Sequence, residues 1–201
     1  MCINNSKNNK APGENMITNI FIKNLPSNWI LYVNNLFNKI LEKETTPDQW
    51  SNSIVKMLYK KKGEKTDPAN YRPIALLNAI VKIFTSVLSC RITEWCNKNN
   101  LIPEWQAGFR KNRACLDNIF VLNSIIQLRV KRSKGKLYAA FVDFKSAFPS
   151  VNHQLLWEKL RRKGLSTKII NILNHLYNGV SASMRVRTNE GLSDNERCIA
   201  G

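Results

Sequence analysis

The sequence has few acidic residues, almost no histidine and no long apolar run. Asp and Glu together number 14 against 31 Lys and Arg, and His occurs only 2 times in 201 residues. No apolar stretch approaches the roughly 20 residues that a membrane-spanning helix needs. The Asn-rich N-terminal residues also lack the apolar centre of a secretion signal. We therefore expect an intracellular protein with no membrane span and no membrane partner.

The few cysteines of the chain do not occur in the paired spacings of disulfide or metal motifs. The 5 cysteines are odd in number, and none stands in the Cys-x-x-Cys spacing of zinc sites and redox motifs. The two histidines, His153 and His175, lie far from them in sequence. This pattern argues against a disulfide framework and against structural zinc, and it is typical of a reduced protein.

Positive charge is abundant and clustered. The formal net charge is +17 and the sequence pI is about 9.9, which indicates a polyanionic partner. Any one cluster is compatible with a solvated surface, but together, with few acids between them, they favour nucleic acid. The clusters are Lys60–Lys62 with Lys65, Arg110–Arg113, Arg129–Lys136, Lys159–Lys163 and Arg185 with Arg187.

Helical and extended patterns alternate along the chain. Residues 1–28 show little apolar periodicity and contain Pro12, Gly13 and Pro26, which predicts an irregular lead-in. The remaining patterns predict helices over 29–41, 78–97, 116–130, 152–163 and 166–177, and strands over 53–59, 137–142 and 180–188. A basic turn over 60–63, extended chain over 68–73 and a turn at Gly191 complete the expected order. The mixture predicts an α+β fold without internal repeats.

Asp143 follows the apolar run Leu137-Tyr-Ala-Ala-Phe-Val142, which is rich in β-formers and too short for a helical period. A carboxylate at the exit of a buried strand needs a cation, a basic partner or solvent, because burying it unpaired is costly. Asp143 is equally suited to capping a short helical turn that begins near Ser146. The local pattern alone leaves these roles open.

Several segments together resemble the reverse transcriptase domain of non-LTR (LINE-type) retrotransposons, with arthropod jockey-like elements most similar. The segments are Asn8-Asn-Lys-Ala-Pro-Gly13, Asn70-Tyr-Arg-Pro-Ile-Ala-Leu-Leu-Asn78 with Lys82, Gln106-Ala-Gly-Phe-Arg-Lys-Asn-Arg113 and Phe141-Val-Asp-Phe-Lys-Ser-Ala-Phe148. The resemblance implies the fingers and part of the palm of a right-hand polymerase. We expect a lead-in over 1–28, a fingers-like region over 29–136 and a partial palm over 137–201.

The resemblance also implies a metal site and a sugar gate. Asp143 corresponds to the first metal-binding carboxylate, and the backbone carbonyl of Phe144 to a second ligand. Two Mg²⁺ ions, or Mn²⁺ in their place, would align the reacting groups. Phe148 stands at the position of the aromatic that excludes a ribose 2′-hydroxyl, although a core aromatic is the alternative.

Nucleotide and template contacts follow from the same resemblance. Arg72 matches the arginine that binds the incoming triphosphate, and Pro73 would present it from extended chain. Lys61 is expected beside it, with Lys60 or Lys62 as alternatives. Arg110 and Arg113 are expected to bind template phosphates. The implied partners are an RNA template, a DNA primer and deoxynucleoside triphosphates, in a nuclear or a cytoplasmic ribonucleoprotein.

The sequence departs from the family pattern in places. Glu14-Asn-Met16 replaces the usual acidic residue and glycine, and Pro149 stands where a second acid is common. The chain reaches Gly201 before the Tyr/Phe-x-Asp-Asp hairpin and the thumb, so we expect a truncated polymerase that is inactive alone. A non-catalytic basic nucleic-acid-binding remnant is the alternative, and maturase-type and telomerase-type enzymes are alternative families.

Overall fold

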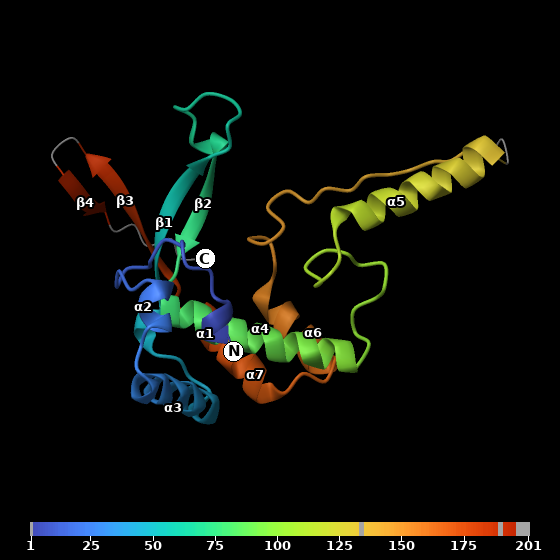
Figure 1. Ribbon diagram of the computed structural model, residues 1–201. Helices are drawn as coiled ribbons and strands as arrows, with labels where there is room; N and C mark the ends of the chain where they lie inside the picture. The colour runs from blue at the N-terminus through green and yellow to red at the C-terminus, as the bar shows by residue number, and fades with distance from the viewer. Residues whose placement is uncertain (1, 133–134, 189–190, 196–201) are drawn as a thin grey trace. The chain divides into compact units, whose positions relative to one another are not determined.

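Four strands form one sheet, and the rest of the described chain consists of helices, turns and loops (Figure 1). The computed structural model describes residues 2–132, 135–188 and 191–195. The chain divides into two compact units. The first consists of Met1–Ser89 and Asn152–Gly201, and the second consists of Cys90–Val151.

The sheet belongs to the first unit and has the strand order β2-β1-β3-β4. Its strands are β1 (Asn52–Tyr59), β2 (Tyr71–Leu76), β3 (Ser181–Thr188) and β4 (Gly191–Asn195). β1 and β2 form an antiparallel hairpin, whereas β1 and β3 are parallel and therefore need the long helical crossover between them. The parallel pair is reinforced by Ser53, whose hydroxyl donates to the Ser181 carbonyl at 3.2 Å.

Helices account for more residues of the first unit than strands do. The helices are α1 (Cys2–Asn5), α2 (Asn19–Lys23), α3 (Ser27–Lys43), α4 (Ala79–Lys98, which continues into the second unit), α6 (His153–Arg162) and α7 (Thr167–Tyr177), with 3₁₀ turns η1 (Asp48–Ser51) and η2 (Pro68–Asn70). α3 ends where Glu44 adopts the left-handed conformation and its N–H donates to the Ile40 carbonyl at 2.9 Å. Asn152 caps the start of α6, because its side chain accepts from the Leu155 N–H.

An aromatic trio forms the centre of the core. The Phe84 ring lies 5.1 Å from Phe37 and 5.3 Å from Trp50, measured between ring centroids. These rings join α3, η1 and α4, and Ile172 of α7 packs against the same cluster and is fully buried. Phe37 and Ile172 lie on the buried faces of the amphipathic helices α3 and α7, so burial of these faces determines how the two helices pack.

The second unit has a different character. It contains the C-terminal part of α4, from Cys90 to Lys98, and the helix α5 (Cys115–Ile126), which continues as the π-helical segment η3 (Gln127–Arg132). Its other described residues form loops and turns. None of its described side chains is buried. The Asp117 carboxylate accepts the Ala114 N–H at 2.8 Å and so satisfies a free amide at the start of α5.

The α+β prediction and all five predicted helices are confirmed, as are the strands over 53–59 and 180–188. Two local predictions are wrong. Residues 1–28 are not irregular throughout, because α1 and α2 form there and Ile22 is buried in the core. The helix predicted over 29–41 starts earlier, at Ser27 directly after Pro26. The turn predicted at Gly191 agrees with the antiparallel pairing of β3 and β4, in which Gly191 is the partner of Thr188, and residues 189–190 lie outside the described part.

The strand expected over 137–142 is also absent. Residues 135–144 form no helix or strand and pair with no strand of the described chain, and Tyr138, Phe141 and Val142 are exposed. A strand is stable only when a neighbour takes its backbone hydrogen bonds and covers its apolar face. An apolar, β-branched run therefore does not suffice to form one.

Candidate nucleotide and nucleic-acid site

The β1–β2 hairpin carries a tightly built loop. Lys60 donates its backbone N–H to the Asn70 carbonyl at 2.8 Å, and the rings of Tyr59 and Tyr71 lie 5.4 Å apart below it. The Asn70 side chain donates to the Glu64 carbonyl at 2.9 Å. Gly63 has a φ of +78°, and a Cβ there would lie 2.4 Å from the Asn70 amide nitrogen. Gly63 and Asn70 thus fix the path of the loop.

The loop distinguishes among the three lysines of the basic turn. The Lys60 ammonium donates to the Ala69 carbonyl at 2.6 Å, which holds it against the loop. Lys61 has a positive φ of 58° at the tip, and like Lys62 it is exposed and has no hydrogen bond or ion pair within the described residues. Lys61 and Lys62 are therefore available to a ligand, whereas Lys60 supports the loop.

Arg72 extends from β2, as the adjacent proline predicted. Pro73 lies within the strand opposite Met57, and Arg72 lies opposite Leu58. Arg72 is exposed and shares its face of the hairpin with Leu58 and Lys56, because side chains alternate along a strand. The predicted presentation of Arg72 from extended chain is confirmed.

Two of the motif segments meet in the first unit. Gly13 packs so closely on Asn78 that an added Cβ would lie 2.5 Å from the Asn78 backbone nitrogen. The Asn78 side chain, which is buried, accepts the Asn15 N–H at 3.2 Å, and the Lys82 ammonium donates to the Ala11 carbonyl at 3.2 Å. The lead-in motif is therefore anchored on the start of α4.

Lys82 lies in an unfavourable setting for its charge. Burial, and to a lesser extent the neighbouring Lys10 charge, lowers the pKa of the Lys82 ammonium from its ordinary value. Its hydrogen bond to Ala11 offsets part of that cost. Because its ammonium group donates to a backbone carbonyl of the lead-in, we interpret Lys82 as a structural anchor of that segment.

In the second unit, one glutamate holds both arginines of the third motif segment. Glu104 pairs with Arg110 at 3.4 Å and forms a shorter contact with Arg113. Arg110 also donates to the Pro103 carbonyl at 3.0 Å, and its side chain is only 19% exposed. Sequence reasoning missed Glu104, although it is the one acidic residue between Lys98 and Arg113.

Two aromatics from different motif segments contact each other. The rings of Phe109 and Phe148 lie 6.1 Å apart, edge to face. Phe109 adopts a positive φ of 59° and is 96% exposed, and Phe148 is also largely exposed. Phe148 is therefore not a core aromatic in the described structure, which removes the alternative considered for it.

Asp143 lies in the second unit, in a segment without helix or strand structure, and is exposed. Residues 145–150 form turns in which Ser146 has a positive φ, and no helix for Asp143 to cap begins there. Within the described chain its carboxylate has no hydrogen bond or ion pair. The capping alternative is thus removed, and the carboxylate is accessible to a cation.

A complete metal site is not formed by the described residues. Nowhere in them do three or more His, Cys, Asp or Glu side chains gather closely enough to hold a metal ion. Asp143 and the unpaired Phe144 carbonyl suit one ion as ligands, since hard cations prefer oxygen. They do not make up the ligand set of two ions.

The structure brings some predicted residues together and leaves others in separate units. Arg72 and Lys61 share the β1–β2 hairpin of the first unit. The second unit contains the other predicted site residues, which are Arg110, Arg113, Asp143, Phe144 and Phe148.

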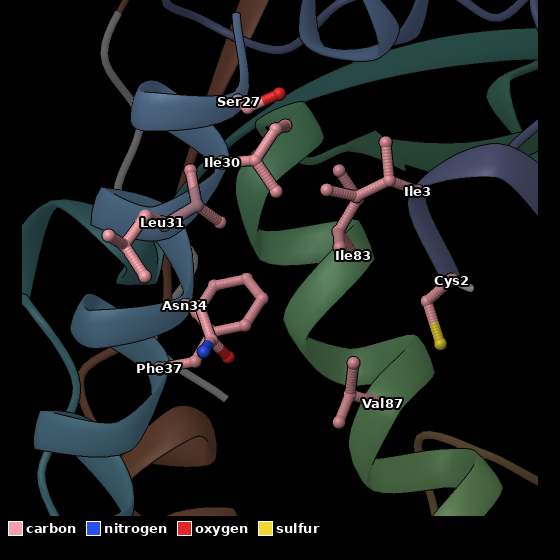
Figure 2. A pocket seen from close by; sticks show the side chains of 10 residues that line it. Cys2, Ile3, Ser27, Ile30, Leu31, Asn34, Phe37, Ile83 and Val87 are labelled. Atoms are coloured by element: carbon pink, nitrogen blue, oxygen red, sulfur yellow. The ribbon is translucent and has the colours of Figure 1, made fainter. Parts of the chain in front are cut away.

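A separate hollow of about 510 Å³ lies between α1, α3 and α4. Figure 2 shows that α3 contributes Ile30 and Phe37 and that α4 contributes Ile83 and Val87 to its walls. Its lining includes no charged side chain and none of the predicted site residues. It therefore lacks the cations that a triphosphate site requires.

Of the described helices, none has both the length and the apolar character needed to cross a membrane.

Comparison with known proteins gives a consistent result. Residues 59–198 match the family model described as "Reverse transcriptase (RNA-dependent DNA polymerase)". In Drosophila melanogaster, the "Probable RNA-directed DNA polymerase from transposon X-element" is 35% identical over 155 residues, which is 77% of this chain and 17% of that protein.

Two further relatives carry the name "RNA-directed DNA polymerase from mobile element jockey". The one from Drosophila melanogaster is 30% identical over 76% of this chain, and the one from Drosophila funebris is 28% identical over 86%. The chain spans 17% and 19% of their lengths. The chain belongs to the reverse transcriptase family, and its relatives are the RNA-directed DNA polymerases of non-LTR retrotransposons.

Proposed function

We propose that this chain supplies the nucleotide-binding region and the first catalytic carboxylate of an RNA-directed DNA polymerase. Its substrates would be an RNA template, a DNA primer and deoxynucleoside triphosphates. The observation that carries the proposal is Asp143, an exposed and unpaired carboxylate inside the segment that matches the reverse transcriptase family. We assign residues 29–136 to the fingers and 137–201 to the first part of the palm.

Nucleotide binding is assigned to the hairpin. Arg72 offers a planar guanidinium whose paired N–H groups suit phosphate oxygens, and Lys61 adds a compact charge at the fixed loop tip. Both are exposed. Their role is to hold the triphosphate so that its α-phosphate faces the primer 3′ hydroxyl.

Sugar selection and template binding are assigned to the second unit. Phe148 would lie against the sugar and exclude a 2′-hydroxyl, and its contact with Phe109 supports the orientation of its ring. Arg113 keeps 39% of its side-chain surface exposed while paired, so it retains donors for a template phosphate. Arg110 would reach the template less directly, since its Glu104 and Pro103 contacts hold the loop.

Reverse transcriptases use divalent metal ions, and Mg²⁺ bound here would supply positive charge at the reacting phosphate. The Asp143 carboxylate and the Phe144 carbonyl would be two of its ligands. One carboxylate cannot hold two ions, so we expect the 201-residue chain to extend no primer by itself.

A chimera tests the proposal. In the X-element polymerase, the matched 155-residue segment is replaced by the corresponding part of this chain, and DNA primer extension on an RNA template is measured. We expect extension, and we expect Asp143→Asn to reduce it by about 10²-fold to 10³-fold, since a metal contact is worth several kcal/mol. Asp117→Asn is the matched control in the same unit, because Asp117 satisfies the start of α5.

The outcomes separate the candidate functions. Full activity with Asn at position 143 would refute the assignment of Asp143. A folded chimera that binds RNA but extends no primer would favour the non-catalytic nucleic-acid-binding remnant instead.

A second test addresses the hairpin. In the same chimera, Arg72→Ala should raise the KM for the nucleotide about 10-fold to 100-fold, as expected when a charged hydrogen bond is lost. Lys56→Ala is the control, because Lys56 lies on the same face of the hairpin but further from the loop. Equal effects of both variants would show that only the general charge of the hairpin matters.

A further inference from the structure

Five cations gather where α6 ends and α7 begins, in the first unit. They are Lys159, Arg161, Arg162, Lys163 and Lys168, and all are exposed. Glu158 is the acidic residue of this stretch, and its carboxylate accepts from the Arg162 guanidinium at 2.6 Å. The other four cations have no acidic partner among the residues that the structure describes.

The turn that carries these cations is fixed by the fold. Gly164 has a φ of +87°, which a residue with a side chain adopts only under strain, and its N–H donates to the Arg161 carbonyl at 2.9 Å. Leu165 donates to the Leu160 carbonyl at 3.1 Å and is only 6% exposed. The cations therefore project from an anchored turn, so little ordering is needed before a ligand binds.

Helix electrostatics explain only part of this cluster. Cations near the C-terminus of α6 are favourable because the last carbonyls carry partial negative charge. Lys168 lies in the first turn of α7, which is the unfavourable end for a cation. An anionic partner shared by both helices accounts for the whole cluster.

The surroundings point to a polymeric phosphate. The exposed residues among the cations are small or polar, such as Gly164, Ser166 and Thr167. No large exposed apolar side chain falls between Glu158 and Lys168 to insert into a lipid layer. Backbone phosphates of a nucleic acid need only such a rigid array of solvated cations.

We propose that the α6–α7 turn is a surface that binds the phosphate backbone of a nucleic acid without reading its sequence. Figure 1 shows this turn well away from the tip of the β1–β2 hairpin within the same unit. It is thus a second contact region, separate from the hairpin, and it does not depend on the chain's being a polymerase.

The test is the salt dependence of binding by the 201-residue chain. A labelled single-stranded RNA is titrated at several salt concentrations, for wild type, for K159Q/R161Q/K163Q and for the control K7Q/K39Q/K43Q, which removes equal charge from exposed positions elsewhere in the same unit. Each lost phosphate contact lowers the slope of log affinity against log salt by about 0.7 for a single strand. We expect the first variant to lose about 2 from the slope and the control to lose much less.

Two comparisons make the result decisive. Equal slopes for the two triple variants would overturn the proposal and leave the cluster as a solvated surface. Parallel titrations with single-stranded DNA and duplex DNA identify the preferred source of phosphate. Binding to phosphatidylserine vesicles is measured as well. If wild type bound the vesicles as tightly as RNA and K159Q/R161Q/K163Q abolished that binding, the choice of nucleic acid as the partner would be overturned. Lys168→Gln, a single exposed change, repeats the test with little risk to folding and should lower the slope by about 0.7.

Discussion

The two compact units differ in whether their large apolar side chains form a core. In the first unit, Phe84 and Ile172 are completely buried in a core shared by several helices. In the second unit, Phe109 and Phe141 are 96% and 85% exposed, and no described side chain is buried. The residues assigned to catalysis and template binding lie mainly in the second unit. Stability and the proposed chemistry therefore depend on different parts of the chain.

The motif residues of the two units differ in how much they contribute to the fold. In the first unit, motif residues such as Gly13 and Asn78 also build the fold, because they fix the lead-in on α4. In the second unit, Asp143, Phe148 and Phe109 make few contacts that stabilise the chain. Their exposure agrees with the ligand-binding roles that we propose for this unit.

Hydrogen exchange should show the largest contrast between the units. Amides of residues 83–88 in α4 should exchange only through global unfolding, whereas amides of residues 137–142 lack strand partners. With a domain stability of at least about 5 kcal/mol, the protection factors should differ by more than about 10³-fold. Amide exchange followed by mass spectrometry measures this, and similar protection in both segments would contradict the comparison.

Matched truncations of phenylalanine should give the next largest contrast. Phe84→Ala removes the centre of the aromatic trio and should lower the free energy of unfolding by about 3–5 kcal/mol. Phe141→Ala changes an exposed side chain and should stay within about 0.5 kcal/mol. Urea unfolding of both variants tests the pair, and a large loss for Phe141→Ala would show a hidden core in the second unit.

Gly13→Ala should have an intermediate effect. The added Cβ would lie 2.5 Å from the Asn78 backbone nitrogen, and backbone cannot move as easily as a flexible side chain. Overpacking of this kind costs about 1–3 kcal/mol. Gly108→Ala is the control in the second unit, since a Cβ there meets no atom within 4 Å. A smaller loss of thermal stability for Gly13→Ala than for Gly108→Ala would refute the anchoring role of Gly13.

The smallest expected effect is a pH dependence from Lys82. Because its pKa is lowered in the folded state, the unfolded chain binds the proton more tightly, and the charge of Lys82 opposes folding below its folded pKa. The stability of wild type relative to Lys82→Met should therefore increase as the pH rises toward the ordinary pKa of 10.5. Urea unfolding of both proteins across this range measures the difference. A decrease in the relative stability of wild type with rising pH would contradict the lowered pKa of Lys82.

Much of the helical fold was predictable because a helix satisfies its own backbone hydrogen bonds. Apolar periodicity therefore placed α3, α4 and α7 to within a few residues. The strand over 137–142 was predicted wrongly, since a strand depends on neighbours that its own sequence does not specify. The helices within residues 1–28 were missed because α1 and α2 have only 4 and 5 residues, too few to show a period.

The candidate site was predictable to a similar extent. Pro73 restricts the residue before it, so the extended presentation of Arg72 followed from sequence. The pairing of Glu104 with Arg110 and Arg113 did not, because it depends on how the loop closes. Nor could the sequence choose among Lys60, Lys61 and Lys62, since that choice rests on the bond from Lys60 to Ala69.

The sequence by itself determined the basic character of the protein, its longer helices and its resemblance to reverse transcriptases. Charge, periodicity and motif order are properties of the chain that need no partner. Only the tertiary structure decided which motif residues support the fold and which remain exposed. That distinction depends on burial and on contacts between distant segments, such as Gly13 with Asn78 and Phe109 with Phe148, and no local pattern encodes it.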